Sequence, residues 1–495
     1  MNNYILLYPL LLVLRLFRKL INTSGRFYAL MHTAPVQPLL EYIGRLKGYE
    51  VYLRAQRTTP AYIRFLHAEQ HKTVSSMSDW AKIPLTTKEN YVKKYSIEDR
   101  CQGGAIPTSG VVIDESSGSS GTPNSWVRNV AERTDVKRML QLALGLTFRH
   151  TNLFVLNCFA LGPWATGMNV SMSLVDIGIM KSIGPDKLKL ENALRQFGPK
   201  YHYLVTGYPP FIKNFVDSTE LDLSRYTMDL VVGGEAISEG LRSYLLRSFR
   251  TVRSSYGASD LEINIGAETD FTIALRRQLL ELPEVCLDIF GKSQPPMIFQ
   301  YDPADYIIET NAESELVYTI TRFHNAAPKI RYNLHDIGSV LTYRVLSAKL
   351  AKYDISLDAI AAPHSKFPVL CIFGRGDLTV PFYGAKIFTA DIEKIINENP
   401  ILVKQLNTFQ LKSYDDDKLN RRLHIALEQV RGGELKLSKL QLREIFYEGL
   451  KANNQDFREV TRMFTPESVE IEVVGFGLGP FADRDIRVKN KYIAA

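Results

Sequence analysis

A short run of hydroxyl side chains and glycines is the part of the sequence best suited to bind phosphate. The run is Ser116-Ser117-Gly118-Ser119-Ser120-Gly121-Thr122, followed by Pro123. Glycines let a backbone turn tightly, and successive N–H groups and hydroxyls can surround phosphate oxygens. No lysine follows the second glycine, so the run is not the usual P-loop, and its glycine spacing excludes a nucleophile elbow. It predicts a phosphate loop; the alternative is a flexible Ser/Gly linker.

The pattern around this run predicts an α/β fold. From about Val111, short β-rich runs alternate with amphipathic helical stretches, whereas the first hundred residues look helical and charged. The expected strands include 111–113, 152–156, 203–205, 229–232, 315–321 and 336–343. Such alternation is typical of a mainly parallel sheet covered by helices.

The length and one polar turn predict two domains. A chain of 495 residues allows about three folding units, or one large domain with a smaller one attached. The turn Arg375-Gly376-Asp377 precedes a smaller α+β stretch with an alternating strand at 468–474. We therefore expect an N-terminal domain over 1–374 and a C-terminal lid over 375–495.

The composition excludes several classes of protein. Hydrophobic residues make up 45% and charged residues 23%, which excludes wholesale disorder, collagen and a coiled-coil rod. The net charge of +7 suits anionic ligands such as nucleotides but is too mild for a nucleic-acid partner. The four cysteines form no CxxC pair, so the pattern fits a reduced, cytoplasmic protein.

The N-terminus carries an apolar run followed by basic residues. The run at 5–14 is too short to span a bilayer, and the charges that follow it argue against a secretory signal. We expect residues 1–20 to pack on their own domain as a helix. The alternative is a basic amphipathic helix on a membrane surface.

Five segments, in order along the chain, resemble motifs of the adenylate-forming superfamily of acyl-CoA synthetases, most of all its phenylacetate–CoA ligase branch. They are 115–123, Gly233-Gly234-Glu235, Tyr256-Gly257-Ala258-Ser259-Asp260, 328–336 and 374–393. Together with the intervening sequence, the matches extend from about residue 80 to residue 393. The resemblance implies a large N-terminal α/β domain with a smaller, mobile α+β C-terminal domain.

The resemblance also implies a nucleotide site. The hydroxyl-rich run would hold the outer phosphates of ATP, and Asp336 would accept hydrogen bonds from the ribose hydroxyls. Tyr256 would stack on adenine, and Asp260 would bind Mg²⁺ between phosphate oxygens. Ordinary turn roles are the alternatives for Tyr256-Gly257 and for Asp336. Besides the run itself, the implied nucleotide site contains Gly234, Glu235, Tyr256, Gly257, Ala258, Ser259, Asp336 and Arg375.

By their position in the family's order, the resemblance implies that two further segments line a pocket for a carboxylic acid substrate. One contains Trp164, Ala165, Thr166 and Gly167, and the other contains Tyr208. Such apolar, glycine-punctuated walls suit an aryl or medium apolar acid. The alternative is plain loop and core packing.

The sequence departs from the family at its C-terminal end. Relatives place a lysine there that bridges the substrate carboxylate and the α-phosphate. In this chain either Lys489 or Arg484 falls near that place, depending on the register, and a third reading gives the role to neither. Arg neutralises charge as Lys does, but its planar fork is not an equivalent replacement.

Together these features predict an ATP-dependent ligase that converts a carboxylic acid to an acyl-adenylate with release of pyrophosphate. The acyl group would then pass to a thiol, with coenzyme A as the expected acceptor. The alternatives are transfer to the phosphopantetheine of an acyl carrier protein or to an amine, and a catalytically silent nucleotide-binding homologue. The identity of the acid stays open, and so does whether the protein forms a homodimer. No nucleic-acid partner is expected.

Overall fold

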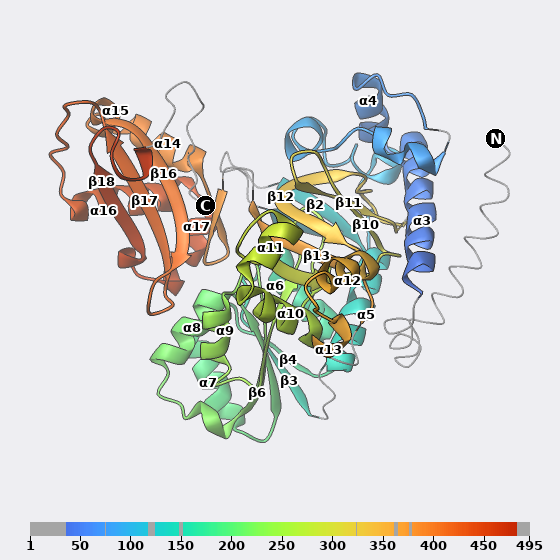
Figure 1. The fold of residues 1–495 in the computed structure, drawn as a ribbon, viewed down its shortest axis with the longest axis horizontal. Helices are drawn as coiled ribbons and strands as arrows, with labels where there is room; N and C mark the ends of the chain where they lie inside the picture. Colours follow the sequence, from blue (N-terminus) through green and yellow to red (C-terminus); the bar gives the residue numbers. More distant parts are fainter. Residues whose placement is uncertain are drawn as a thin grey trace.

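The computed structural model describes residues 36–74, 76–116, 124–147, 152–322, 324–360, 365–375 and 379–482. Several predicted features lie outside these residues: the N-terminal segment 1–20, Ser117 to Thr122 of the hydroxyl-rich run, Arg484 and Lys489. Figure 1 shows the elements after residue 379 gathered at one side of the molecule, next to a larger body that holds the main sheet.

The larger body is built on an eleven-stranded sheet with the order β10-β11-β12-β13-β9-β8-β7-β6-β5-β3-β4. One half is parallel and consists of β3 (Leu153–Asn157), β4 (Ile179–Ser182), β5 (His202–Gly207), β6 (Thr227–Gly233) and β7 (Thr251–Tyr256). The other half is antiparallel and consists of β8 (Gly266–Ala267), β9 (Met297–Gln300), β10 (Tyr306–Thr310), β11 (Glu315–Ile320), β12 (Tyr332–Leu341) and β13 (Val369–Arg375).

The expectation of a mainly parallel sheet is therefore wrong for half of it. Helices connect the parallel strands: α6 (Ala165–Leu174), α7 (Lys187–Phe197), α8 (Pro209–Ser218) and α9 (Glu239–Leu245). A parallel pair needs such a long crossover, whereas a short turn such as 311–314 between β10 and β11 leaves the chain running back antiparallel. The expected strands themselves are all present.

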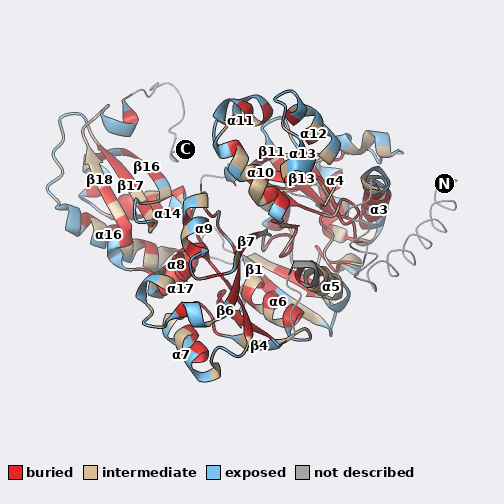
Figure 2. Ribbon diagram, turned by 60° about the horizontal axis from the view of Figure 1, so that its bottom comes forward, coloured by how far each residue is buried: buried red, intermediate tan, exposed pale blue. Residues whose placement is uncertain are grey.

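The parallel strands form the centre of the core. All five residues of β3 and all six of β5 are buried, as expected for strands covered on both faces by helices. Figure 2 shows the buried residues concentrated along the strands. The four cysteines are also buried, and each is a free thiol.

A two-stranded hairpin flanks the hydroxyl-rich run. Strand β1 (Val111–Ser116) pairs antiparallel with β2 (Asn124–Asn129), and Ser116 lies opposite Asn124. Helix α5 (Val130–Thr147) follows β2 directly. The sequence pattern predicts a helical stretch over 132–146, which α5 confirms, but the sequence reasoning missed β2. The hairpin fixes both ends of the predicted phosphate loop.

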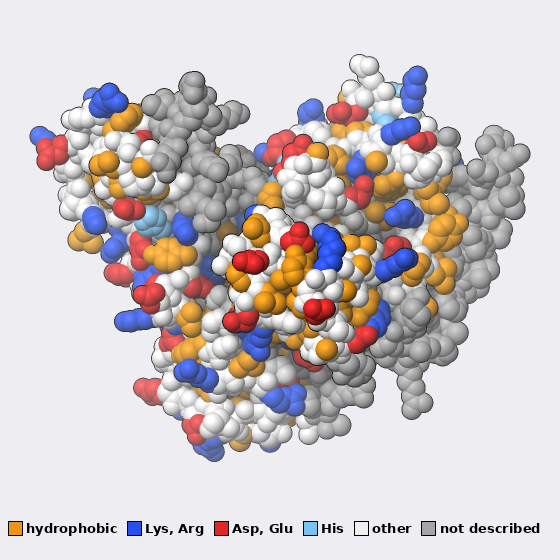
Figure 3. Space-filling view, viewed as in Figure 1, with side chains coloured by type: hydrophobic (Ala, Val, Ile, Leu, Met, Phe, Trp, Pro, Cys, Tyr) orange, Lys and Arg blue, Asp and Glu red, His pale blue; other side chains and the backbone are white. Residues whose placement is uncertain are grey.

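Helices complete the larger body around the sheet. They are α3 (Gln37–Thr58), α4 (Pro60–Ala68), α10 (Asp270–Leu280), α11 (Pro283–Phe290), α12 (Tyr343–Ala351) and α13 (Leu357–Ile360). Within the described ranges, none of the helices combines the length and the apolar character needed to span a bilayer. On the face shown in Figure 3, acidic and basic side chains are interspersed over the described residues.

The C-terminal part is a small α+β unit. A hairpin of β14 (Thr379–Phe382) and β15 (Ala385–Phe388) leads into a three-stranded sheet of β16 (Leu406–Asp415), β17 (Arg421–Gln429) and β18 (Val469–Val474). Its helices are α14 (Thr389–Glu398), α15 (Leu402–Gln405), α16 (Lys439–Asn453) and α17 (Gln455–Val460). The expected strand at 468–474 corresponds to β18. The predicted domain boundary falls at the last residue of β13 and stays a prediction.

Candidate active site

The predicted site residues of the parallel half gather at one edge of the sheet. Gly234 and Glu235 follow β6, Tyr256 ends β7, and Tyr208 follows β5. Because the carboxyl ends of parallel strands share one edge, segments that are far apart in sequence meet there. This edge is where open α/β sheets bind ligands.

Tyr256 and Asp336 are in direct contact. The Tyr256 hydroxyl donates a hydrogen bond to the Asp336 carboxylate, and it lies 2.8 Å from the hydroxyl of Tyr318. Burial, reinforced by the charge of Asp336, raises the pKa of Tyr256 well above its usual value. The structure thus joins two predicted nucleotide residues and adds Tyr318, which the sequence reasoning missed.

The ring of Tyr256 lies among other aromatic rings. It is stacked with Tyr318 at 6.2 Å between centroids and tilted against Phe299 at 5.7 Å. Stacking of Tyr256 on adenine therefore stays a prediction. Arg375, another predicted nucleotide residue, lies opposite Asp336 as its backbone partner in the β12–β13 pairing. A buried aromatic residue on a strand such as β11 looks like core in the sequence, so no pattern marked Tyr318.

The segment after β7 forms a tight turn. A Cβ on Gly257 would lie 2.8 Å from backbone atoms of residues 262–264, so the close approach of the chain requires glycine. The Ala258 amide donates to the carbonyl of Glu262 at 3.0 Å, and the Ser259 carbonyl accepts from Arg128. The turn presents Asp260, which is 3% exposed.

Tyr332 and Lys88 are among the polar neighbours of Asp260. The Tyr332 hydroxyl donates to its Oδ2 at 3.0 Å, and the Lys88 ammonium lies 3.4 Å from the same oxygen. Lys88 begins the short helix Lys88–Val92, and nothing in its sequence context marked it as a site residue.

Asp260 suits a magnesium ion only where substrate phosphates and water supply the other ligands. Among the described residues, no three acidic, histidine or cysteine side chains cluster as a metal cage. Mg²⁺ is commonly bound by one or two carboxylates together with substrate phosphates and water. A single carboxylate near the phosphate hairpin suits that arrangement.

Cationic groups surround Trp126 on β2, three residues after Pro123. The Lys329 ammonium lies 3.9 Å from the centre of the indole, and the Arg100 guanidinium lies 5.3 Å from it. Burial, together with Arg128 and Arg100, holds the pKa of Lys329 well below its usual value. Arg100 and Lys329 therefore both lie beside the strand that follows the predicted phosphate loop.

Glu235 lies beneath the C-terminal part of the chain. Its Oε1 accepts a hydrogen bond from the amide of Gly384, and its Oε2 lies 3.5 Å from Nε of Arg421. Burial raises the pKa of Glu235, although Arg421 and the Gly384 amide counteract that rise. The predicted adenine-side loop is thus also a contact between the two parts of the molecule.

Tyr208 is held between two glycines. Its ring lies 2.9 Å from the position a Cβ would take on Gly234, and 2.4 Å from that position on Gly384. Both glycines have a positive φ, +81° and +87°. The ring also meets Phe159 edge-on at 5.1 Å. A larger residue at either glycine would displace Tyr208, a predicted part of the acid pocket.

Residues 164–167 form the start of α6 and lie beside β1. Glu115 donates its amide to the Pro163 carbonyl at 2.9 Å, and Trp164 forms a parallel bridge with Glu115. A Cβ on Gly167 would lie 2.0 Å from the Ala160 carbonyl oxygen, so only glycine fits there. Thr166 is half-buried in the first turn of α6.

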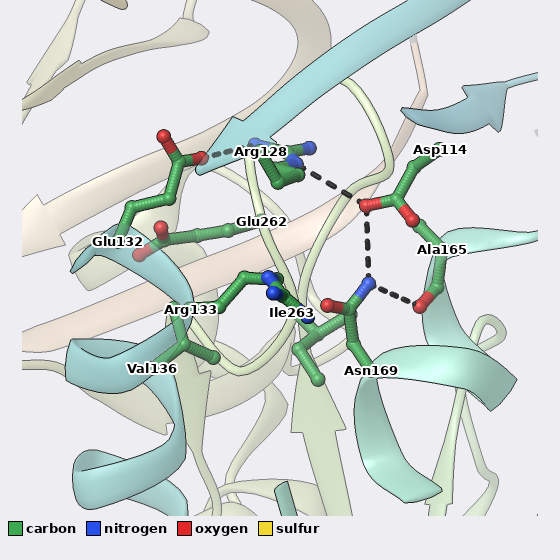
Figure 4. A pocket seen from close by; sticks show the side chains of 9 residues that line it. All are labelled: Asp114, Arg128, Glu132, Arg133, Val136, Ala165, Asn169, Glu262 and Ile263. Carbon is green, nitrogen blue, oxygen red and sulfur yellow. Dashed lines mark hydrogen bonds and ion pairs between the residues drawn. The ribbon is translucent and has the colours of Figure 1, made fainter. Parts of the chain in front are cut away.

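The cavity in Figure 4 is more polar than the expected acid pocket. Ala165 is the one predicted acid-pocket residue that lines it. In that cavity Asn169 bonds Asp114 at 3.1 Å and the Ala165 carbonyl at 2.6 Å, while Arg133 contacts the sulfur of Met172 at 3.3 Å. The full lining is Asp114, Arg128, Glu132, Arg133, Val136, Ala165, Asn169, Glu262 and Ile263. Five charged side chains make it unsuited to an apolar acid.

The large mixed sheet with a small α+β unit is also found in solved structures of a 2-hydroxyisobutyryl-CoA ligase, and the predicted fold class is confirmed. The chain is similar to 2-hydroxyisobutyryl-CoA ligase in complex with 2-HIB-AMP and CoA in the thioesterification state. The TM-score is 0.64 at 13% identity, over 94% of this chain and 91% of that one.

Other states of the same ligase superpose less well. An open conformation with 2-HIB-AMP and CoA gives a TM-score of 0.55 at 13% identity, over 94% of this chain and 93% of that one. The postadenylation state with 2-HIB-AMP gives 0.54 at 12% identity, over 94% and 91%. No protein-family model matches the sequence, and no curated protein matches it significantly.

Proposed function

We propose that this protein is an ATP-dependent acid ligase that forms an acyl-adenylate and transfers the acyl group to a thiol. The observation that supports the proposal is the contact of Tyr256, at the carboxyl end of β7, with Asp336 on β12. Asp260 belongs to the same segment as Tyr256, and the hairpin of the predicted phosphate loop is bonded to that segment.

The first step joins two anions. An oxygen of the acid attacks the α-phosphorus of ATP, the bond to the β-phosphate breaks, and pyrophosphate leaves. Neutralisation of charge therefore dominates the barrier. The hydroxyl-rich run would hold the departing phosphates, and Asp336 would accept hydrogen bonds from the ribose while the Tyr256 hydroxyl holds the carboxylate in place. Lys489 or Arg484 would neutralise the acid.

Asp260 would orient the nucleotide through a magnesium ion. When bound, Mg²⁺ supplies neutralisation of the phosphate charge. Asp260 would hold that ion from the side of β7, and Lys88 would lie beside it. The nearby arginines would keep the base of the phosphate loop positive.

The second step transfers the acyl group from AMP to a thiol sulfur, and AMP leaves. Coenzyme A is the proposed acceptor, because the similar ligase binds CoA together with an acyl-adenylate. A carrier-protein phosphopantetheine or an amine is the alternative. The C-terminal part, from residue 375, would act as the lid that serves both steps.

The finer assignments belong to the same proposal. We propose an aryl or medium apolar acid as the substrate, as the phenylacetate-type resemblance implies, with its binding site near Tyr208 and Trp164. A cytoplasmic location follows from the scattered, reduced cysteines. Packing of residues 1–20 on their own domain and a homodimer stay predictions.

ATP–pyrophosphate exchange tests the proposal. Purified protein with Mg²⁺ is screened against aryl, fatty, 2-hydroxy and amino acids, and exchange with one class is expected. Addition of CoA should then release the acyl-CoA. Asp336→Asn should lower exchange strongly with the same acid. Nucleotide binding without exchange for any acid would instead favour the silent homologue, and absence of nucleotide binding would refute the site.

A further inference from the structure

We propose that Arg128 is a positioning residue that attaches the Asp260 turn to the phosphate hairpin, so that metal-bound nucleotide is held by one rigid unit. The inference rests on the proposed function and assigns a role to a residue that no motif singles out. Arg128 lies on β2 and is 5% exposed.

The guanidinium of Arg128 holds the backbone on both sides of Asp260. Its Nη2 donates to the carbonyl of Ser259 at 2.6 Å, and its Nη1 donates to the carbonyl of Leu261. These two residues immediately precede and follow Asp260 in the chain. Arg128 therefore ties the backbone on both sides of Asp260 to the hairpin, while Tyr332 bonds the Asp260 side chain itself.

Two carboxylates fix the guanidinium in turn. Asp114 on β1 accepts from its Nε at 3.3 Å, and Glu132 in the first turn of α5 lies 3.7 Å from its Nη1. Figure 4 shows Arg128 at the point where these side chains converge. Three elements around the predicted phosphate loop thus share one buried cation.

The turn that presents Asp260 needs such an anchor because it is not part of a β-ladder. Residues 257–265 lie between β7 and β8 and belong to neither strand. Mg²⁺ demands nearly ideal octahedral geometry, so a small displacement of its carboxylate weakens binding. Residues that orient a metal ligand typically contribute about 10- to 100-fold to metal affinity.

The planar fork of Arg128 is the essential feature. A guanidinium reaches several acceptors at once in fixed directions, whereas an ammonium is a single point charge. Arg128→Lys keeps the charge between Asp114 and Glu132 and loses the simultaneous bonds to Ser259 and Leu261. The substitution therefore separates positioning from charge.

The test is calorimetric binding of ATP to the full chain, once with Mg²⁺ and once with EDTA. We expect the wild type to bind ATP more tightly with Mg²⁺, and Arg128→Lys to lower that metal-dependent gain by about tenfold. Affinity in EDTA should change little. Mn²⁺ bound to the protein–ATP complex, followed by electron paramagnetic resonance, gives a second readout that needs no turnover.

Arg242→Lys is the matched control. Arg242 is 1% exposed, lies between Glu239 and Glu268, and donates to the Val252 carbonyl at 2.7 Å. It repeats the chemistry of Arg128 away from Asp260. We expect a similar loss of thermal stability in both variants and a loss of the magnesium effect in Arg128→Lys alone.

Three outcomes would overturn the inference. One is an equal loss of ATP affinity with and without Mg²⁺, and another is an equal effect of Arg242→Lys. If Arg128→Lys does not fold, Asp114→Asn replaces it, and an unchanged magnesium effect there would contradict the proposal. A wild type that binds no nucleotide refutes the proposed function itself, whereas normal binding with an insensitive Arg128 refutes the inference alone.

Discussion

At the scale of single residues, the candidate site depends on hydroxyl groups that hold carboxylates in place. The Tyr256 hydroxyl donates a hydrogen bond to the Asp336 carboxylate, and the Tyr332 hydroxyl donates one to Asp260 at 3.0 Å. A tyrosine on a strand reads as core in the sequence. Only the fold reveals that its hydroxyl reaches a carboxylate on another strand.

The hydroxyl of Tyr318 should matter for ribose recognition. In Tyr318→Phe, Tyr256 loses the neighbour at 2.8 Å that orients its bond to Asp336. We expect about a 2- to 10-fold lower affinity for ATP, the range for one hydrogen bond of about 0.5–1.5 kcal/mol. Binding of 2′,3′-dideoxy-ATP should not change, because that nucleotide lacks both ribose hydroxyls.

Tyr203→Phe provides the control for this variant. Tyr203 is equally buried, and its hydroxyl donates to the Gly198 carbonyl at 2.6 Å, away from Asp336. The assay is fluorescence titration of each variant with both nucleotides. Equal losses for ATP and the dideoxy analogue would show that Tyr318 has a structural role only.

At the scale of elements, helix α6 is positioned by a close backbone approach. Gly167 lies in its first turn, and the Ala160 carbonyl lies where a Cβ would be. The helix therefore packs against the segment after β3 without an intervening side chain. This contact fixes Trp164 and Ala165 relative to β1.

Gly167→Ala should displace α6. Because both sides of the contact are backbone, we expect a loss of about 1–3 kcal/mol in the free energy of unfolding, typical of overpacking. Gly240→Ala, in α9, meets only the end of a leucine side chain at 3.5 Å and should be neutral or stabilising. Urea denaturation measures both variants, and equal stabilities would contradict the steric argument.

At the scale of the whole molecule, the C-terminal part is held over the sheet edge by polar contacts. Arg421 on β17 lies near Glu235 and bonds Asp415 at 3.0 Å. Lys213 on α8 reaches Asn420 at 2.9 Å, and Asn214 reaches the Met463 carbonyl at 2.7 Å. The two parts also share apolar contacts, since the Tyr208 ring packs against Gly384 and one hydrophobic cluster contains residues of both.

Arg421→Gln should loosen this arrangement. It leaves the buried carboxylate of Glu235 and the half-buried carboxylate of Asp415 without their shared cation, and breaking a buried ion pair costs about 3–5 kcal/mol. We expect a larger radius of gyration in small-angle X-ray scattering. Arg458→Gln is the control, because Arg458 bonds only carbonyls of its own C-terminal part. An unchanged scattering curve for Arg421→Gln would contradict the prediction.

The resemblance to acyl-CoA synthetase motifs marked Gly234, Tyr256 and Asp336 as site residues. Gly234 follows β6 and Tyr256 ends β7, so both lie at the carboxyl edge of the parallel strands, whereas Asp336 lies inside β12. The predicted strands are all present because their periodicity is local. The antiparallel half, β2 and the polar cavity were not foreseen, because strand direction and cavity lining depend on residues far apart in the chain.

The sequence by itself determined the α/β class and the order of the segments along the chain, since hydrophobic periodicity and turn chemistry act over a few residues. The tertiary structure decided which side chains meet: Tyr318 with Tyr256, Arg128 with the backbone around Asp260, and Arg421 with Glu235. Such contacts join residues from 62 to 186 positions apart, a separation at which pattern carries no information about distance.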